Sequence, residues 1–176
     1  MVAKYYTGVG SRETPAEICK LFHWLGEAFA NEGWTLRSGC APGADTAFES
    51  GAKSAMARCP MPEFYLPWPG FEERGNDGWQ YVTDPQPEAL DIAAQFHPAW
   101  DRCKQGARKL HARNVHQVLG KDVTNPVLSK FLICWTPEAS GSGGTGQALR
   151  IAKHYGVQIF DAGDAAVVSR LERWLG

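Results

Sequence analysis

Short apolar runs and stretches with helical spacing alternate along the chain. Runs rich in β-forming residues predict strands at residues 5–9, 34–38 and 63–68. Between them, apolar side chains recur every three or four positions, which predicts helices at residues 15–31 and 44–58. This order of strand and helix is typical of a parallel sheet with helices on both faces.

The second half of the chain continues the alternation after an interruption. Residues 69–86 lack clear periodicity and are expected to form an inserted loop, and helices are expected at 87–97 and 100–119. Residues 130–135, KFLICW, form a nearly continuous apolar run, which is typical of a central buried strand. A helix, a strand and a last helix follow at residues 147–156, 157–161 and 165–175. The pattern predicts one α/β domain over residues 1–176 with about five core strands.

The start of the first helix carries a capping pattern. Thr14 can cap the helix, Pro15 suits the first helical position, and Glu17 completes a capping box three residues after the threonine. Gly33 is expected to close the same helix.

Composition excludes several classes of protein. A net charge of −1 leaves no overall positive field, which counts against a protein whose main task is to hold DNA. The five cysteines are scattered, odd in number and free of a C-x-x-C pair, so neither a disulfide framework nor a structural zinc site is expected. The sequence shows neither a secretory core nor an apolar run of about 18 residues. We therefore expect a reduced, cytoplasmic protein without a membrane partner.

A first glycine-rich loop, TGVGSRETP, follows the first predicted strand. Gly8 and Gly10 allow a tight turn, Ser11 offers a hydroxyl and Arg12 a fixed cation. Because the loop faces the amino end of a helix, it could cradle a phosphate or carboxylate. The alternative is a turn that needs glycine for steric reasons only.

A second loop, SGCAPGAD, links the second predicted strand to the next helix. Gly39 and Gly43 would let another molecule approach the backbone, with Ser38 and Ala44 beside them. Asp45 either caps the helix or accepts a hydrogen bond from a sugar hydroxyl, and the sequence leaves both interpretations open.

The third loop, GSGGTGQALR, follows the most hydrophobic predicted strand. Gly143, Gly144 and Gly146 surround Thr145, and a ligand lying against the loop would explain such small residues beside a buried strand. The loop is not a Walker A motif, because no G-K-[ST] follows.

The predicted helix at 100–119 carries several polar side chains in KLHARNVHQVLG. Arg113 and Asn114 could reach a phosphate or a base across the sheet. His111 and His116 are five positions apart, which does not place two imidazoles on one helix face, and no carboxylate lies at ligand spacing. We therefore predict no metal site and interpret both histidines as surface residues.

These segments together resemble the SLOG superfamily of Rossmann-like domains. That group includes the DNA-processing protein A (DprA) family and the Lonely-Guy, lysine decarboxylase-like phosphoribohydrolases. GVGSR is similar to the group's first loop, LRSGCAPGADTAFESGA to the DprA stretch S-G-x-A-x-G-x-D, and ARNVHQVLG to the DprA segment R-N-R-I-I-A-G-L-S. SGGTGQALRIAKHYGVQIF occupies the place of the family's S-G-x-x-x-T-x-x-A loop. The order agrees, and the match spans most of the chain except about residues 69–104.

The resemblance implies a three-layer Rossmann-like fold with a nucleotide-type pocket at the carboxyl edge of the sheet, and no cofactor. It also implies a homodimer or higher homo-oligomer, because such domains commonly pair through helices. The implied ligand-binding residues are Gly8, Gly10, Ser11, Arg12, Ser38, Gly39, Gly43, Ala44, Asp45, Arg113, Asn114, Gly143, Gly144 and Thr145.

One departure from the family bears on activity. The phosphoribohydrolases carry P-G-G-x-G-T-x-x-E, and this chain has Gln147 at the threonine and Arg150 at the glutamate. An arginine would repel the oxocarbenium-like charge of N-glycosidic cleavage. Arg113 and Glu138 are the remaining catalytic candidates, and the catalytic residues stay unknown. The sequence leaves open a sensor or sequestering protein and an atypical nucleotide-processing enzyme.

The alternative function is a non-catalytic, single-stranded DNA-binding recombination mediator of DprA type. A local basic segment between Trp100 and Lys121 could hold a strand by phosphate pairing and stacking, or could simply be a solvated helix face. Its cations are Lys104, Arg108, Lys109, Arg113 and Lys121.

The segment 68–81 is rich in aromatic residues. Trp68, Phe71, Trp79 and Tyr81 either form a lid that stacks on a base or pack the insert onto the core.

Overall fold

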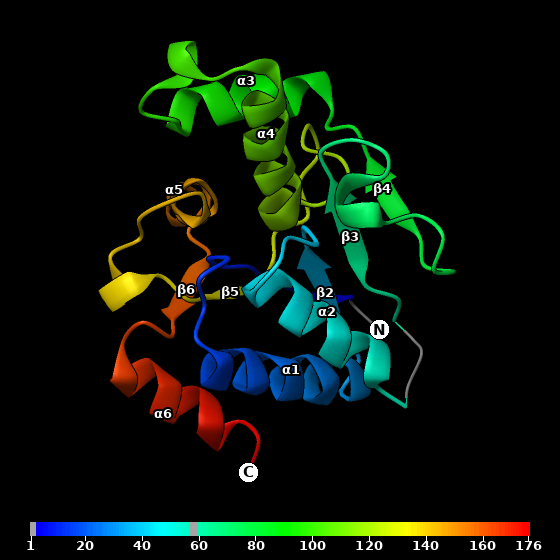
Figure 1. Ribbon diagram of the computed structural model, residues 1–176, viewed down its shortest axis with the longest axis vertical. Helices are drawn as coiled ribbons and strands as arrows, with labels where there is room; N and C mark the ends of the chain where they lie inside the picture. Colours follow the sequence, from blue (N-terminus) through cyan, green and yellow to red (C-terminus); the bar gives the residue numbers. More distant parts are fainter. Residues whose placement is uncertain (1–2, 57–59) are drawn as a thin grey trace.

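The computed structural model describes residues 3–56 and 60–176 and contains one parallel sheet of six strands. The strands lie in the order β4-β3-β2-β1-β5-β6 (Figure 1). Central β1 pairs with β2, where Tyr6 lies opposite Leu36, and with β5, where Thr7 lies opposite Leu132. The strands are β1 (Lys4–Gly8), β2 (Trp34–Ser38), β3 (Glu63–Leu66), β4 (Tyr81–Thr83), β5 (Phe131–Cys134) and β6 (Gln158–Asp161).

Helices cover both faces of the sheet, which completes the predicted three-layer Rossmann-like fold (Figure 1). On one face lie α1 (Ala16–Asn31), α2 (Ala44–Ser54) and α6 (Ala165–Arg173). On the other lie α4 (Gln105–Leu119) and α5 (Thr145–His154), with α3 (Pro87–Phe96) packed against both of them. Short 3-10 turns are η1 (Phe71–Glu73), η2 (Trp100–Arg102) and η3 (Pro137–Ala139).

Two hydrophobic cores, one on each side of the sheet, fix these layers. The α1, α2 and α6 side is aromatic, with Tyr6, Phe22 and Phe48 fully buried. The other side is built from smaller residues such as Ala93, Val115 and Ile151. Side chains of β5 alternate between the two cores, because successive residues of a strand point to opposite faces. A strand buried on both faces therefore reads as the continuous apolar run seen in the sequence.

The strand count is six and not the predicted five, because β4 lies within the segment expected to be an inserted loop. This strand has three residues and sits at the sheet edge, beside β3. It is held by Tyr81, whose ring stacks on Phe64 with 5.6 Å between centroids. Three residues are too few to show a periodicity, so the sequence pattern could not reveal this strand.

Some helix boundaries also differ from the prediction. The described α2 ends at Ser54, and residues 57 and 58 of the predicted helix lie outside the described residues. The predicted helix at 100–119 divides into η2 and α4, because Cys103 is extended. The predicted capping box is wrong: Thr14 donates its hydroxyl hydrogen to the Ser11 carbonyl at 2.6 Å, and no side chain caps α1.

Candidate functional site

A pocket of about 460 Å³ lies where the chain reverses its direction across the sheet. From β1 the strands proceed to one edge through β2, β3 and β4, and the chain then crosses to β5 on the other side of β1. Loops that follow β1 and β5 therefore diverge and leave a crevice at their carboxyl ends. The pocket is lined by these two loops, by the loop after β2 and by α4. Its volume is within the usual range for small-molecule sites.

The structure brings most of the predicted ligand-binding residues to this pocket. Those that line it are Gly10, Ser11, Arg12, Asp45, Arg113, Asn114, Gly143, Gly144 and Thr145. Those that lie outside the lining are Gly8, Ser38, Gly39, Gly43 and Ala44. All three glycine-rich loops thus contribute, but only part of each faces the pocket.

The glycines outside the lining have packing roles. A Cβ at Gly8 would lie 2.7 Å from the ring of Phe48, and one at Gly39 would lie 2.6 Å from Nη1 of Arg113. Gly43 has φ +91° and its Cβ would meet the Ser11 carbonyl oxygen at 2.6 Å. Since side chains have no room at these positions, the glycines let the loops approach each other closely.

Asp45 joins the first two loops from the base of the pocket. Its carboxylate accepts hydrogen bonds from the Gly10 and Gly39 amides, each at 3.1 Å. The side chain is only 3% exposed. Burial raises the pKa of Asp45 to about 6, and Arg113 and the amide donors oppose that rise. Asp45 therefore links the two loops, and no side chain caps α2, so the helix-cap interpretation is wrong.

Arg113 places a cation beside Asp45. Its Nη1 donates to the Gly39 carbonyl at 2.6 Å, whereas its buried Nε has no hydrogen-bond partner in the described chain. Burial lowers the pKa of Arg113, and the charge of Asp45 opposes that shift. Gln117 lies one helical turn further on, donates to Asp45 at 3.5 Å, and leaves its buried Oε1 without a partner among the described residues. Both atoms are buried, so a ligand in the pocket would reach them only after one of these side chains moves.

The third loop forms the open side of the pocket. Asn114 donates to the Gly144 carbonyl at 3.4 Å, which ties this loop to α4. A Cβ at Gly143 or Gly144 would meet nothing within 4 Å, so their backbones face open space. The loop leads into the amino end of α5, where unpaired amides favour an anion.

Neither Glu138 nor Arg150 lines the pocket. Glu138 is exposed in η3, and Arg150 donates to the Phe96 carbonyl at 2.7 Å and to Oε1 of Gln147 at 2.9 Å. The carboxylates in the lining are Glu13, which is exposed, and Asp45. No acid in the described lining occupies the position of the family glutamate.

Several lining residues were not predicted. Gln117 could have been found, because it lies four positions after Arg113 on the same helix face. The others come from the same loops, from α4 and from α5. They are Val9, Glu13, Ala41, Ala107, Leu110, His111, Ser142 and Ala148.

The aromatic insert packs on the core outside this pocket. Trp79 and Tyr81 surround Phe64, and Phe71 is buried with the guanidinium of Arg113 at 5.6 Å from its ring centre. Trp68 contacts the ring of Phe71 edge-on at 5.4 Å. The insert thus contacts the guanidinium of Arg113 through the ring of Phe71.

The basic segment is largely occupied by contacts within the protein. Arg108 donates to the Trp100 carbonyl at 3.3 Å and lies over its ring. Lys109 pairs with Asp84 at 3.1 Å. Arg113 is buried, whereas Lys104 is exposed.

The two histidines of α4 have separate environments. His116 is buried, so its predicted surface position is wrong: Nε2 accepts from the Gln86 amide at 3.1 Å and the ring stacks on Tyr65. His111 is half-buried beside His97. Burial lowers the pKa of His111 to about 4, and the nearby charges of His97, Arg150 and Arg113 lower it further.

Comparisons with known proteins bear on the fold. No family model and no curated protein sequence matches the chain. Among solved structures, the Moco carrier protein of Chlamydomonas rheinhardtii matches with a TM-score of 0.50 and 16% sequence identity. The match covers 93% of this chain and 77% of that protein. In the described residues, no helix has the length and apolar character needed to cross a bilayer. The chain thus has a Rossmann-like α/β fold, which it shares with that carrier protein, and its own sheet has six strands.

Proposed function

We propose that this chain binds an anionic, nucleotide-type small molecule in the pocket between the loops after β1 and β5. The observation that carries the proposal is the place of the pocket. Parallel α/β sheets bind ligands at the carboxyl ends of the strands where the strand order reverses. Here that point adjoins three loops and a buried arginine.

The lining residues divide into two groups by chemistry. Backbone amides of Gly143 and Gly144, at the amino end of α5, would hold a phosphate together with Arg12. Arg113 and Gln117 also line the pocket, and rotation of either side chain would turn its Nε or Oε1, which has no partner among the described residues, toward a polar group of the ligand. Asp45 would hold the first two loops in place beside the ligand, because its oxygens already accept from the Gly10 and Gly39 amides.

We assign the pocket to ligand binding or carriage and not to hydrolysis. The carboxylate that cleaves N-glycosidic bonds in the resembling enzymes is replaced by Arg150, which is engaged with the backbone of Phe96. Asp45 already holds two amides, so it is poorly free to act as a nucleophile or base. The structurally similar Moco carrier protein is named as a carrier, which agrees with a binding role for a fold of this kind.

Single-stranded DNA binding, the alternative from the DprA resemblance, has weaker support. Most cations of the basic segment contact the protein's own groups. Binding of a DNA strand needs cations that are available to its phosphates. We further propose that the chain is a single SLOG-type domain, acts in the cytoplasm and forms a homodimer. Sedimentation of the purified protein tests the last point.

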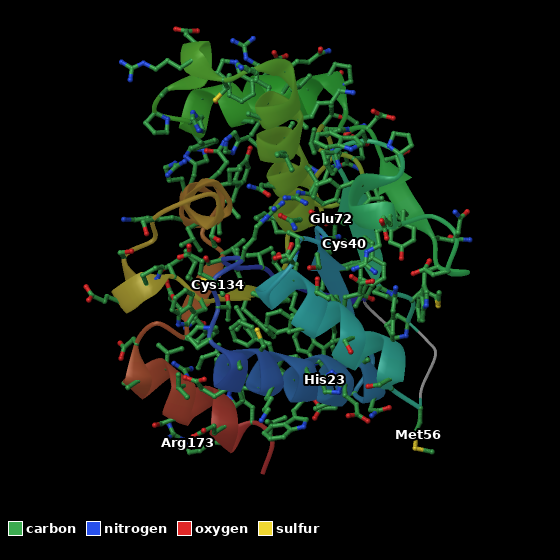
Figure 2. All side chains as sticks on the ribbon, in the orientation of Figure 1. His23, Cys40, Met56, Glu72, Cys134 and Arg173 are labelled. Atoms are coloured by element: carbon green, nitrogen blue, oxygen red, sulfur yellow. The ribbon has the colours of Figure 1, made fainter. Side chains whose placement is uncertain are left out.

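Thermal shift and calorimetry with inorganic phosphate, nucleoside mono- and diphosphates, and Moco test the proposal. We expect a stabilising shift that follows RT ln(1 + [L]/Kd) with at least one of them. Arg12→Ala should reduce the shift, because it removes a cation that lines the pocket. The side chain is 62% exposed, so the substitution should leave the fold intact. Arg173→Ala on α6 is the matched control, since Figure 2 shows Arg173 at the far side of the molecule from Glu72, the ion-pair partner of Arg12.

Three results would count against this function. Absence of any shift across the panel would remove the support for a small-molecule pocket. Oligonucleotide binding that weakens steeply with salt, with no response to mononucleotides, would favour the recombination mediator instead. Release of free base from the nucleoside monophosphates would show that the protein is an N-glycosidic hydrolase.

A further inference from the structure

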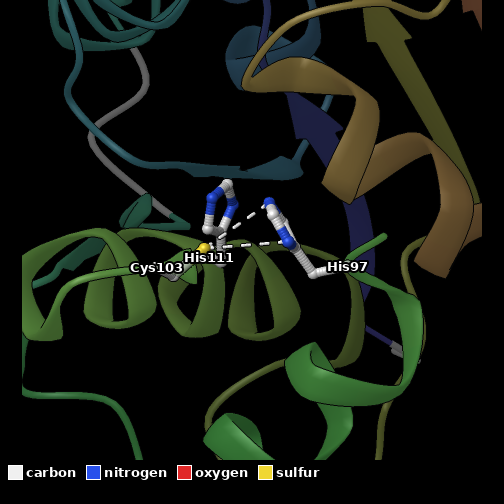
Figure 3. A group of neighbouring side chains, drawn as sticks. All are labelled: His97, Cys103 and His111. Atoms are coloured by element: carbon white, nitrogen blue, oxygen red, sulfur yellow. Dashed lines mark hydrogen bonds between the residues drawn. The ribbon is translucent and has the colours of Figure 1, made fainter. Parts of the chain in front are cut away.

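Three side chains that commonly bind metals meet at the outer end of α4. His97 follows α3, Cys103 lies between η2 and α4, and His111 is on α4 (Figure 3). One ligand atom from each lies within 4.8 Å of the other two. Cys103 Sγ is 3.7 Å from Nδ1 of His97, and the two imidazole centres are 4.2 Å apart.

These separations are close to those of a metal site. In tetrahedral zinc, bond lengths of about 2.3 Å to sulfur and about 2.0 Å to nitrogen place sulfur and nitrogen about 3.6 Å apart. The Sγ–Nδ1 distance already agrees with that value. No pair of these atoms is more than 4.8 Å apart, so side-chain rotation of the partly buried residues has to close at most about 1.5 Å.

The cluster also contains an unused ligand atom. Nδ1 of His111 is buried and has no hydrogen-bond partner within the part of the chain that the structure describes. A buried polar atom without a partner is uncommon and calls for an explanation. Nδ1 of His97 accepts from the Ala99 amide at 3.1 Å, so a metal there would replace one hydrogen bond.

The surrounding charges set the kind of cation. Arg113 and Arg150 act on His111 electrostatically and disfavour any cation there, so a site of neutral nitrogens alone would be weak. A thiolate from Cys103 supplies compensating charge. A set of two imidazoles and one thiolate suits a borderline-soft cation such as Zn²⁺.

We propose that His97, Cys103 and His111 bind one divalent cation of the zinc type, with a fourth coordination position left for water or an anion. On binding, the Cys103 thiol becomes a thiolate bonded to the metal, and its proton goes to solvent. Because His111 also lines the pocket, the cation lies at the pocket rim. The site depends on these three side chains and does not require the proposed nucleotide-type ligand.

Titration of the chelator-stripped full chain with Co²⁺, and then with Zn²⁺ in competition, tests the site. We expect one Co²⁺ per chain, with a thiolate-to-cobalt charge-transfer band that Zn²⁺ abolishes. Zn²⁺ should also protect Cys103 of the unmodified protein from alkylation, as read by peptide mass spectrometry. This second measurement needs no variant and stands even if a substitution impairs folding.

Variants locate the cation. Cys103→Ser and His111→Asn should each weaken Zn²⁺ binding at least about a hundredfold, since loss of a residue that only hydrogen-bonds to a metal ligand already costs about 10- to 100-fold. Cys19→Ser and His23→Ala, at half-buried residues of α1, are the controls and should bind as the unmodified protein does. The proposal is overturned if Co²⁺ is not taken up at one per chain, if Cys103→Ser keeps the charge-transfer band, or if Zn²⁺ leaves Cys103 alkylation unchanged.

Discussion

Asp45 gives a prediction about the pH dependence of stability. Burial raises its pKa in the folded chain from the ordinary 3.8 to about 6, because the desolvation of the carboxylate outweighs the attraction of Arg113. The folded state therefore binds a proton more tightly than the unfolded state. Stability contributed by the protonated acid is present below about pH 4 and is lost as the pH rises through about 6.

The size of this loss follows from the shift of the pKa. A shift of about two units corresponds to roughly 3 kcal/mol, of which about 2–3 kcal/mol falls between pH 4 and pH 7. Asp45→Asn removes the titration and leaves one of the two loop amides without an acceptor. That second effect costs about 1–3 kcal/mol, and it is the same at every pH.

The assay is urea unfolding followed by tryptophan fluorescence at several pH values between 4 and 7. We expect the free energy of unfolding of the unmodified protein, minus that of Asp45→Asn, to fall by about 2–3 kcal/mol over this range. Asp101→Asn, at an exposed residue, should show no such change. A difference that rises with pH would refute the reasoning, since it would mean that the charge of Arg113 outweighs burial.

Other substitutions probe the core and the pocket separately. Arg37 is 2% exposed and pairs with Glu63 at 2.8 Å, so Arg37→Met should lower the free energy of unfolding by about 3–5 kcal/mol in urea. Gly144→Ala should leave stability within about 0.5 kcal/mol, because its Cβ meets open space, but should weaken nucleotide binding in calorimetry; equal binding would place the ligand elsewhere. Glu72→Gln should tighten phosphate binding severalfold at low salt, because it frees Arg12 from a 3.3 Å ion pair, and the effect should disappear at high salt.

The candidate site was partly predictable, and the limits have a physical cause. Parallel strands place all their carboxyl ends on one edge, so the loops with Ser11, Asp45 and Thr145 had to lie near one another. The sequence could not show which glycines face a ligand. Gly39 packs against Arg113 and Gln117 whereas Gly144 faces open space, and only the folded structure shows this difference. Gln117 was within reach, since helical spacing places it beside Arg113.

The apolar pattern alone predicts the five longer strands, their parallel arrangement and the loops that end them. Strands buried on both faces must be apolar throughout, and helices on a sheet must repeat every three or four residues, so both leave a local pattern. The edge strand β4 and the cluster of His97, Cys103 and His111 become evident only in the folded chain. Both depend on contacts between segments that leave no local period: β4 on Phe64 of a neighbouring strand, the cluster on how the chain reverses between α3 and α4.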